Sequence, residues 1–342
     1  MKGGVCLLII TSSLMLHSLP AAAFQQRPQR APRKLPDLNL RVDVYDAAAV
    51  CDGTTVLTDN CSVNGPRVIE VDMKGEIVWQ YVLPEGLKRY TNPGFDVEPL
   101  PNGDFLLALP RKGVFEINRE GDIVWSYMDG KVSHDVDRLP NGNTLIVWGG
   151  SDETGDAQAK EIDPEGKVVW AWYAKDYFYH PPYKDIYEDG WTHANAVSRL
   201  ANGNTLISLR NFHFVVEVDA KGAVVRTIGD GLLKHQHDPE PLPNGNVLIA
   251  NHGRPQAAVE IDPDSGEVVW EFKMPDRATW PVRDANRLPN GNTLITGTTE
   301  IVEVTRDGQV VWDLVIEGAE FRGREAASLG FYKAHRIPAS GL

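Results

Sequence analysis

The chain has 342 residues, with 47 acidic and 34 basic side chains and a formal net charge of −13. Basic residues do not cluster in the body of the chain, so we expect no nucleic-acid partner. Beyond the first 23 residues, no apolar run is long enough to span a membrane, and we expect no membrane span.

The first 23 residues have the features of an export signal. Lys2 gives a basic start, an apolar stretch broken by polar residues runs over 5–19, and Ala21-Ala22-Ala23 provides a small-residue cleavage site. This pattern predicts a periplasmic or secreted protein whose mature chain begins at Phe24. Residues 24–40 are rich in Pro and Arg and show no periodicity, so we expect a flexible leader before the folded body at 41–342.

Two cysteines remain after the export signal. Cys51 and Cys61 lie ten residues apart, a spacing that in an exported protein predicts one disulfide closing a small loop. The alternative is a pair of thiols. Both residues lie in the first repeat, and either way we expect a structural role.

Two phrases recur through the body of the chain. Each is expected to form a β-hairpin, because a turn-forming Gly joins two runs of alternating apolar residues. The first phrase, LPNGN or a close variant before an apolar run, predicts a type I′ Asn-Gly turn and occurs at 100–108, 139–147, 200–208, 242–250 and 288–296. The second joins an acidic-apolar run through Gly to an apolar run ending in Trp, and occurs at 68–79, 114–125, 160–170, 259–270 and 301–312, with a sixth copy at 215–226 ending in Arg226.

Two hairpins per repeat give four short antiparallel strands. Four strands every 40 to 50 residues is the pattern of a β-propeller, and six copies predict an all-β fold of six four-stranded blades. The C-terminal segment FYKAHRIP at 331–338 begins a repeat and stops. We expect it to pair with the opposite end of the chain and close the ring, because an open propeller would expose an edge strand.

The strand before each LPNGN turn is predicted to line the central channel. Counting seven residues back from the Asn of each turn, and then two more, gives residues that share one strand face. On that face the sequence places His134, His193, Asn195, His235, His237 and Arg283. Arg210 and His252, each eight residues past the Asn of its turn, are expected at the same channel mouth. A cluster of imidazoles and guanidiniums predicts a functional pocket, because buried histidines need specific partners.

Two other repeated features are interpreted as structural. An Asp six residues before the Asn of the turn recurs as Asp96, Asp135, Asp238 and Asp284, and is expected to accept backbone N–H groups or to pair with a neighbouring blade. The terminal Trp residues are expected to pack between blades. An aromatic-rich insertion at 172–195 either arches over the channel mouth and offers apolar walls to an aromatic ligand, or is a loop packed on itself.

Three segments resemble the bacterial arylsulfate sulfotransferase family, within the quinoprotein-like group of propellers. They are SHDVDRLPNGNTL, then WTHANAV followed by NGNTLISLRN, and HQHDPEPLPNGN, in a similarity covering roughly 90–312. The resemblance implies a periplasmic six-bladed propeller that moves a sulfuryl group from a phenolic sulfate to another phenol through a sulfated histidine, without a nucleotide donor or other cofactor.

Carried over by motif, the resemblance makes His237 the sulfated histidine and gives catalytic roles to His134, His193 and Arg210. We expect Asn195, His235, His252 and Arg283 to contact the substrate, and we assign no metal ligand. Two alternatives stay open: a propeller that binds a ligand or protein without chemistry, and a metal-dependent lyase or hydrolase that uses the histidines as ligands. A quinone-dependent dehydrogenase is less well supported, because no quinone-specific motif is present.

Overall fold

The computed structural model describes residues 1, 35, 37–91, 94–275, 281–319 and 329–341. The chain divides into two compact units, 1–31 and 32–342, and the described strands all belong to the second. The predicted export signal lies outside the described residues apart from Met1, as does the leader up to residue 34. Within the described part, no helix is long and apolar enough to cross a membrane.

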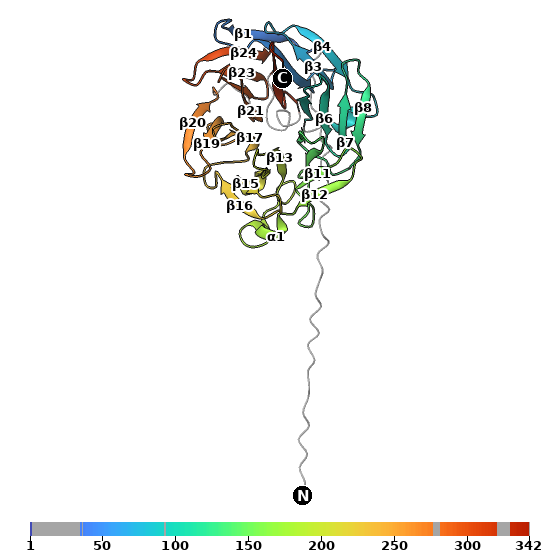
Figure 1. Cartoon of the computed structure of the whole chain (residues 1–342), viewed down its shortest axis with the longest axis vertical. Helices are drawn as coiled ribbons and strands as arrows, with labels where there is room; N and C mark the ends of the chain where they lie inside the picture. Colours follow the sequence, from blue (N-terminus) through green and yellow to red (C-terminus); the bar gives the residue numbers. More distant parts are fainter. Residues whose placement is uncertain (2–34, 36, 92–93, 276–280, 320–328, 342) are drawn as a thin grey trace. The chain divides into compact units, whose positions relative to one another are not determined.

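Six antiparallel sheets stand around a central axis, which confirms the predicted six-bladed β-propeller (Figure 1). From the inner to the outer strand, the blades are β25 (Ala334–Pro338), β2 (Gly53–Asp59), β3 (Arg67–Val71) and β4 (Ile77–Val82); β5 (Asp96–Pro99), β6 (Phe105–Leu109), β7 (Gly113–Ile117) and β8 (Ile123–Tyr127); and β9 (Val136–Arg138), β10 (Thr144–Val147), β11 (Ala159–Ile162) and β12 (Val168–Trp172).

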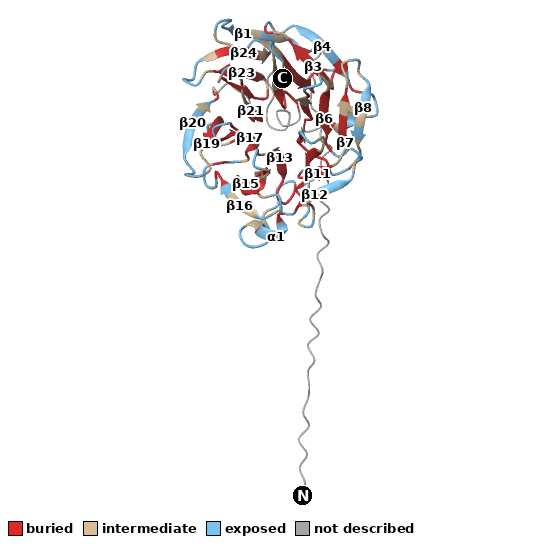
Figure 2. Cartoon of the chain, in the orientation of Figure 1, coloured by how far each residue is buried: buried red, intermediate tan, exposed pale blue. Residues whose placement is uncertain are grey.

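The remaining blades are β13 (Ala194–Arg199), β14 (Thr205–Leu209), β15 (Phe214–Val218) and β16 (Val224–Ile228); β17 (His237–Pro241), β18 (Val247–Asn251), β19 (Ala257–Ile261) and β20 (Val268–Lys273); and β21 (Asp284–Arg287), β22 (Thr293–Thr296), β23 (Glu300–Val304) and β24 (Val310–Ile316), with β1 (Leu40–Tyr45) outermost. The middle strands are buried and the outer strands are largely exposed (Figure 2).

Both chain ends contribute to closing the ring. β25 pairs with β2, from Leu57 opposite Ala334 to Gly53 opposite Pro338, and so supplies the inner strand of the first blade. This confirms the predicted closure and explains why the first blade lacks an LPNGN turn, since its inner strand arrives from the far end of the chain. β1 pairs with β24 and adds a fifth strand to the last blade, which the repeat pattern did not predict.

The LPNGN hairpins form, but the predicted type I′ turn is wrong. In the first of them, the Gly103 N–H donates to the Leu100 carbonyl at 2.9 Å, and the Leu100 N–H donates to the Asp104 carbonyl at 2.8 Å. Gly103 has a φ of +90° whereas Asn102 does not have a positive φ. This is a type I turn followed by a left-handed Gly, and Pro at the second position favours it because its ring fixes φ near −65°.

The terminal Trp residues link neighbouring blades, as expected. The indole N–H of Trp79 donates to the Arg119 carbonyl at 2.9 Å, and that of Trp312 donates to the Met73 carbonyl at 2.9 Å across the closure. Where the repeat has Arg226 instead of Trp, the guanidinium makes the contact with the next blade and also pairs with a carboxylate of its own blade. It donates to the Pro263 carbonyl at 3.0 Å and pairs with Glu217 at 3.0 Å.

The predicted disulfide is wrong. Cys51 and Cys61 both remain buried thiols. The residues between them form β2, a seven-residue strand rather than a loop. At about 3.3 Å of rise per residue, this strand alone spans roughly 20 Å and holds the two cysteines at opposite ends. A disulfide requires a Cα separation below about 7 Å.

Candidate functional site

The starts of the inner strands gather at one end of the channel. His237 opens β17, while His134, His193 and Arg283 lie one or two residues before β9, β13 and β21. Each of these four inner strands precedes an LPNGN turn or its LANGN variant, so they run the same way along the axis and begin at the same end. His193 and His235 both have a φ of +47°, a left-handed conformation that is uncommon for a non-Gly residue and is often found at functional sites.

The imidazole rings meet in three pairs at this end. The ring centroids of His134 and His193 are 5.0 Å apart. Those of His237 and His252 are 4.2 Å apart and stacked. In the third pair, the ring centroids of His235 and His213 are 4.8 Å apart. Counting along the repeats did not predict His213 as a pocket residue. His134 in turn contributes to the lowered pKa of His237, which places the first two pairs within electrostatic reach of each other.

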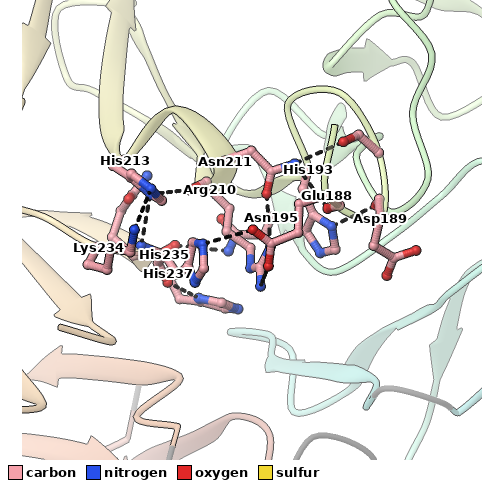
Figure 3. A network of polar contacts seen from close by, with 12 residues as sticks. Glu188, Asp189, His193, Asn195, Arg210, Asn211, His213, Lys234, His235 and His237 are labelled. Atoms are coloured by element: carbon pink, nitrogen blue, oxygen red, sulfur yellow. Dashed lines mark hydrogen bonds and ion pairs between the residues drawn. The ribbon is translucent and has the colours of Figure 1, made fainter. Parts of the chain in front are cut away.

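Hydrogen bonds fix the tautomers of two of these histidines. Nδ1 of His237 lies 3.1 Å from the carbonyl oxygen of His235, and Nδ1 of His193 lies 2.8 Å from that of Asp189 (Figure 3). A carbonyl oxygen only accepts, so each Nδ1 carries the proton and each Nε2 keeps its lone pair. Both rings therefore offer Nε2 as a nucleophile or a base.

Burial and nearby cations keep the imidazoles neutral. Burial and the Arg210 guanidinium lower the pKa of His193 to about 4, and the same two causes lower that of His235 to about 4. The pKa of His237 falls well below its usual value through burial, then through His252 and Arg283. At neutral pH the pocket thus combines uncharged imidazoles with guanidinium cations.

Two arginines supply the positive charge. Arg210 begins a short 3-10 helix, Arg210–Phe212, and its Nη1 donates to Asn211 Oδ1 at 2.8 Å. Arg283 is buried, and burial lowers its pKa to about 10, so it stays cationic. Its guanidinium carbon lies 4.8 Å from the ring centroid of Tyr332.

The insertion at 172–195 contributes a carboxylate to the pocket. Glu188 Oε1 lies 3.6 Å from Arg210 Nη2, and its Oε2 lies 3.4 Å from His235 Nε2 (Figure 3). The buried and half-buried aromatic residues of the insertion pack on one another and on the fourth blade, as in the 4.9 Å contact between the rings of Tyr183 and Phe212. For these rings, the insertion is therefore a loop packed on itself and on its blade, rather than an apolar wall over the channel mouth.

All eight predicted catalytic and substrate-contacting residues lie at this end of the channel. Asn195 is buried there and its Nδ2 donates to the Gln236 carbonyl at 2.9 Å, while its Oδ1 has no partner among the described residues. Sequence reasoning missed Glu188, His213 and Tyr332. The sequence repeat could have identified Tyr332. Aligning RIP at 336–338 with RLP at 287–289 puts Tyr332 in register with Arg283.

The repeated Asp residues have the structural role expected of them. Asp96 Oδ2 accepts the Val136 N–H at 3.2 Å, and Asp135 Oδ2 accepts the Val197 N–H at 2.7 Å, each from the next blade. Lys333, which stands in the register of these aspartates, is buried among them and lies 2.9 Å from Asp238. A cavity of about 460 Å³ extends from this cluster toward the LPNGN turns, away from the paired imidazoles.

The described residues offer no ready metal site. Within those ranges, no three His, Cys, Asp or Glu side chains are grouped to hold a metal ion. The imidazoles instead lie in pairs, and Nδ1 of His193 and of His237 each bond to a backbone carbonyl.

Comparisons with known proteins give two family matches and several structural neighbours. The model of the arylsulfotransferase (ASST) family matches residues 42–231, and the model described as outer membrane protein assembly factor BamB matches residues 155–334. No curated protein matches the chain.

Three solved structures illustrate the structural similarity. A protein of unknown function from Bacteroides caccae has 19% identity and a TM-score of 0.57 over 77% of this chain and 93% of that one. A catalytically inactive virginiamycin B lyase from Staphylococcus aureus with quinupristin has 12% identity and a TM-score of 0.51 over 82% and 90%. A streptogramin B lyase has 11% identity and a TM-score of 0.51 over 83% and 88%. At these identities the similarity concerns the fold alone.

Proposed function

Because the chain belongs to the arylsulfotransferase family of PQQ-like propellers, we propose that it transfers a sulfuryl group between phenolic compounds, with His237 as the residue that carries the group. The observation that carries this proposal is the state of His237. Its Nδ1–H bonds to the His235 carbonyl, so Nε2 is the atom with a lone pair, and two guanidiniums lie within electrostatic reach.

In the first half of the reaction, Nε2 of His237 attacks the sulfur of an aryl sulfate. The N–S bond forms, the bond from sulfur to the aryl oxygen breaks, and its electron pair leaves on the phenolate. In this proposal Arg210 and Arg283 bind the sulfuryl oxygens, because guanidinium groups donate charge-assisted hydrogen bonds to such oxyanions. Burial strengthens these interactions by excluding water.

In the second half, the hydroxyl oxygen of an acceptor phenol attacks the sulfur. The N–S bond breaks, its electron pair returns to Nε2 of His237, and the phenol proton passes to a neutral imidazole. His193 suits this task because the Asp189 carbonyl holds its Nδ1–H and leaves Nε2 as a base. Asn195 Oδ1, with no partner among the described residues, suits a hydrogen bond from the acceptor hydroxyl. The sulfuryl donor is then the aryl sulfate itself, without a nucleotide, and the first 23 residues favour a periplasmic or secreted site of action.

The test combines product formation with detection of the intermediate. The protein is mixed with 4-nitrophenyl sulfate, with and without phenol, and phenolate release is followed by absorbance while the intact mass of the protein is recorded. We expect the protein to gain one sulfuryl group, located at His237, and to lose it when phenol is added. His237→Ala should show neither signal, whereas His180→Ala, at an exposed histidine of the insertion, should behave as wild type.

Two other outcomes of this test would favour a propeller that only binds ligands or a metal-dependent lyase or hydrolase. Binding of 4-nitrophenyl sulfate without release of phenolate and without a mass change would favour a propeller that only binds ligands. Activity that chelators abolish and a divalent metal restores would favour the metal-dependent alternative. Either result would contradict sulfuryl transfer through His237.

A further inference from the structure

The C-terminal strand brings one more side chain to the pocket. Tyr332 lies two residues before β25 and occupies the register that holds His134, Asn195, His237 and Arg283 in other blades. Its ring centroid is 6.2 Å from that of His134, and the Arg283 guanidinium carbon lies 4.8 Å from it. Ring closure therefore completes the set of residues around the channel mouth.

The surroundings of Tyr332 hold its ring in place. Gly94 packs so closely that a Cβ at that position would lie 2.2 Å from Tyr332 Cδ2. The backbone is tied down on both sides, because the Phe331 N–H donates to the Thr298 carbonyl at 2.8 Å and Lys333 pairs with Asp238 at 2.9 Å. The ring has little freedom to turn away, so the hydroxyl is preorganised.

The hydroxyl of Tyr332 is buried and has no hydrogen-bond partner among the described residues. The residue is 2% exposed, and burial raises the pKa of the phenol above its usual value, so the group keeps its proton. A buried polar group left without a partner destabilises a protein, because it loses its hydrogen bonds to water and gains none in the fold. Such a group calls for an explanation, and a ligand that accepts its hydrogen bond provides one.

The proposed reaction needs a donor that its two acting histidines, His193 and His237, do not provide. Nε2 of His193 and Nε2 of His237 carry lone pairs, and the two guanidiniums are assigned to the sulfuryl oxygens. The aryl oxygen becomes negative as its bond to sulfur breaks, and a fixed donor at that point stabilises the transition state more than the ground state. A protonated phenol meets this requirement.

We infer that Tyr332 is a further catalytic residue, whose hydroxyl donates a hydrogen bond to the aryl oxygen that leaves sulfur. This inference rests on the proposed function. The N–S bond forms, the S–O bond breaks with its electron pair on the aryl oxygen, and Tyr332 retains its proton. In the reverse sense, the same hydroxyl orients the oxygen of the incoming acceptor.

Tyr332→Phe tests this role through the leaving group. Because the hydroxyl has no partner among the described residues, the variant should melt at the wild-type temperature or above it. With phenyl sulfate, whose phenolate is a poor leaving group, we expect kcat/KM to fall about 100-fold. With 4-nitrophenyl sulfate, which leaves with less charge on the aryl oxygen, the loss should stay below about tenfold. Tyr81→Phe, at a buried tyrosine of the outer strand β4, is the matched control and should change neither value.

A binding measurement keeps this inference separate from the proposed function. 4-Nitrophenolate, the product of the first step, is titrated into wild type and Tyr332→Phe and followed by its absorbance shift, with an expected loss of affinity of about tenfold. Equal losses of kcat/KM for the two sulfates would overturn the role of Tyr332. If wild type transfers no sulfuryl group, the proposed function fails, and an unchanged affinity for the phenolate would then overturn the inference as well.

Discussion

The imidazole rings of His237 and His252 lie stacked, with centroids 4.2 Å apart and planes inclined by 18°. His237 opens the inner strand of its blade, and His252 directly follows the second strand, β18. The ring of His252 therefore backs that of His237 and fixes its orientation, while a hydrogen bond to the backbone of Val282 helps to hold His252 itself.

His252→Ala should lower kcat/KM by at least about tenfold, because a nucleophile that loses its support leaves the productive geometry. His252→Phe restores a flat ring and should recover most of the activity. Steady-state kinetics on 4-nitrophenyl sulfate measures both. If His252→Phe is as poor as His252→Ala, the ring nitrogen rather than the stacking is what matters.

Arg210→Gln should change the pH profile as well as substrate binding. Burial and Arg210 together hold the pKa of His193 near 4, so in wild type this base stays neutral and active down to about that pH. Removing the cation raises the pKa of His193 toward its usual value, and the acid limb of kcat/KM for the acceptor phenol should move to higher pH. KM for the aryl sulfate should rise about 10- to 100-fold.

The control for this prediction is Arg89→Gln, at an exposed arginine remote in sequence from the pocket, which should leave the profile unchanged. An acid limb at the same pH in Arg210→Gln and wild type would contradict the proposed coupling between Arg210 and His193.

Glu188→Gln should strengthen anion binding. The Glu188 carboxylate lies beside Arg210 and His235, where it competes with a sulfuryl group for the same guanidinium. Its side chain is 60% exposed, so the effect is partly screened by solvent, and we expect sulfate affinity to rise about three- to tenfold at low ionic strength. Isothermal titration with sodium sulfate measures it.

Glu153→Gln is the matched control, since Glu153 is a nearby carboxylate that accepts a hydrogen bond from Tyr187 at 3.5 Å rather than pairing with Arg210. Equal sulfate affinity in all three proteins would show that Glu188 does not compete for the anion site.

Arg336→Ala should destabilise the closure of the ring. Arg336 on β25 pairs with Glu303 at 3.1 Å, and both side chains are fully buried. Removing the cation leaves a buried carboxylate without its charge partner, so the free energy of unfolding should fall by about 3–5 kcal/mol. Urea denaturation followed by tryptophan fluorescence measures the change.

Arg306→Ala provides the comparison. Arg306 is half exposed, and its partner Glu260 keeps a second pair with Arg287 at 2.9 Å. This variant should lose no more than about 1 kcal/mol. A loss in Arg336→Ala no larger than that in Arg306→Ala would mean that the buried pair does not stabilise the closure.

The amino-acid sequence alone was enough to predict the four repeated strands of each blade, the number of blades and the end of the channel where the histidines gather. These features depend on chain neighbours: β-strands alternate every two residues, Gly must occupy the left-handed position of each turn, and a fixed count from that turn places His134, Asn195, His237 and Arg283 in one register. These local patterns do not depend on which other segment of the chain packs beside the repeat.

Contacts between distant segments emerge only in the folded ring. Folding separates Cys51 from Cys61 by making the residues between them a strand, adds β1 to the last blade, and brings Glu188 and Tyr332 to the histidines. The repeat pattern predicts the closing strand, but which side chains then meet depends on how distant segments and the insertion pack against one another. The blades and the register of most pocket residues therefore follow from local patterns, whereas the contacts among those residues follow from the tertiary structure.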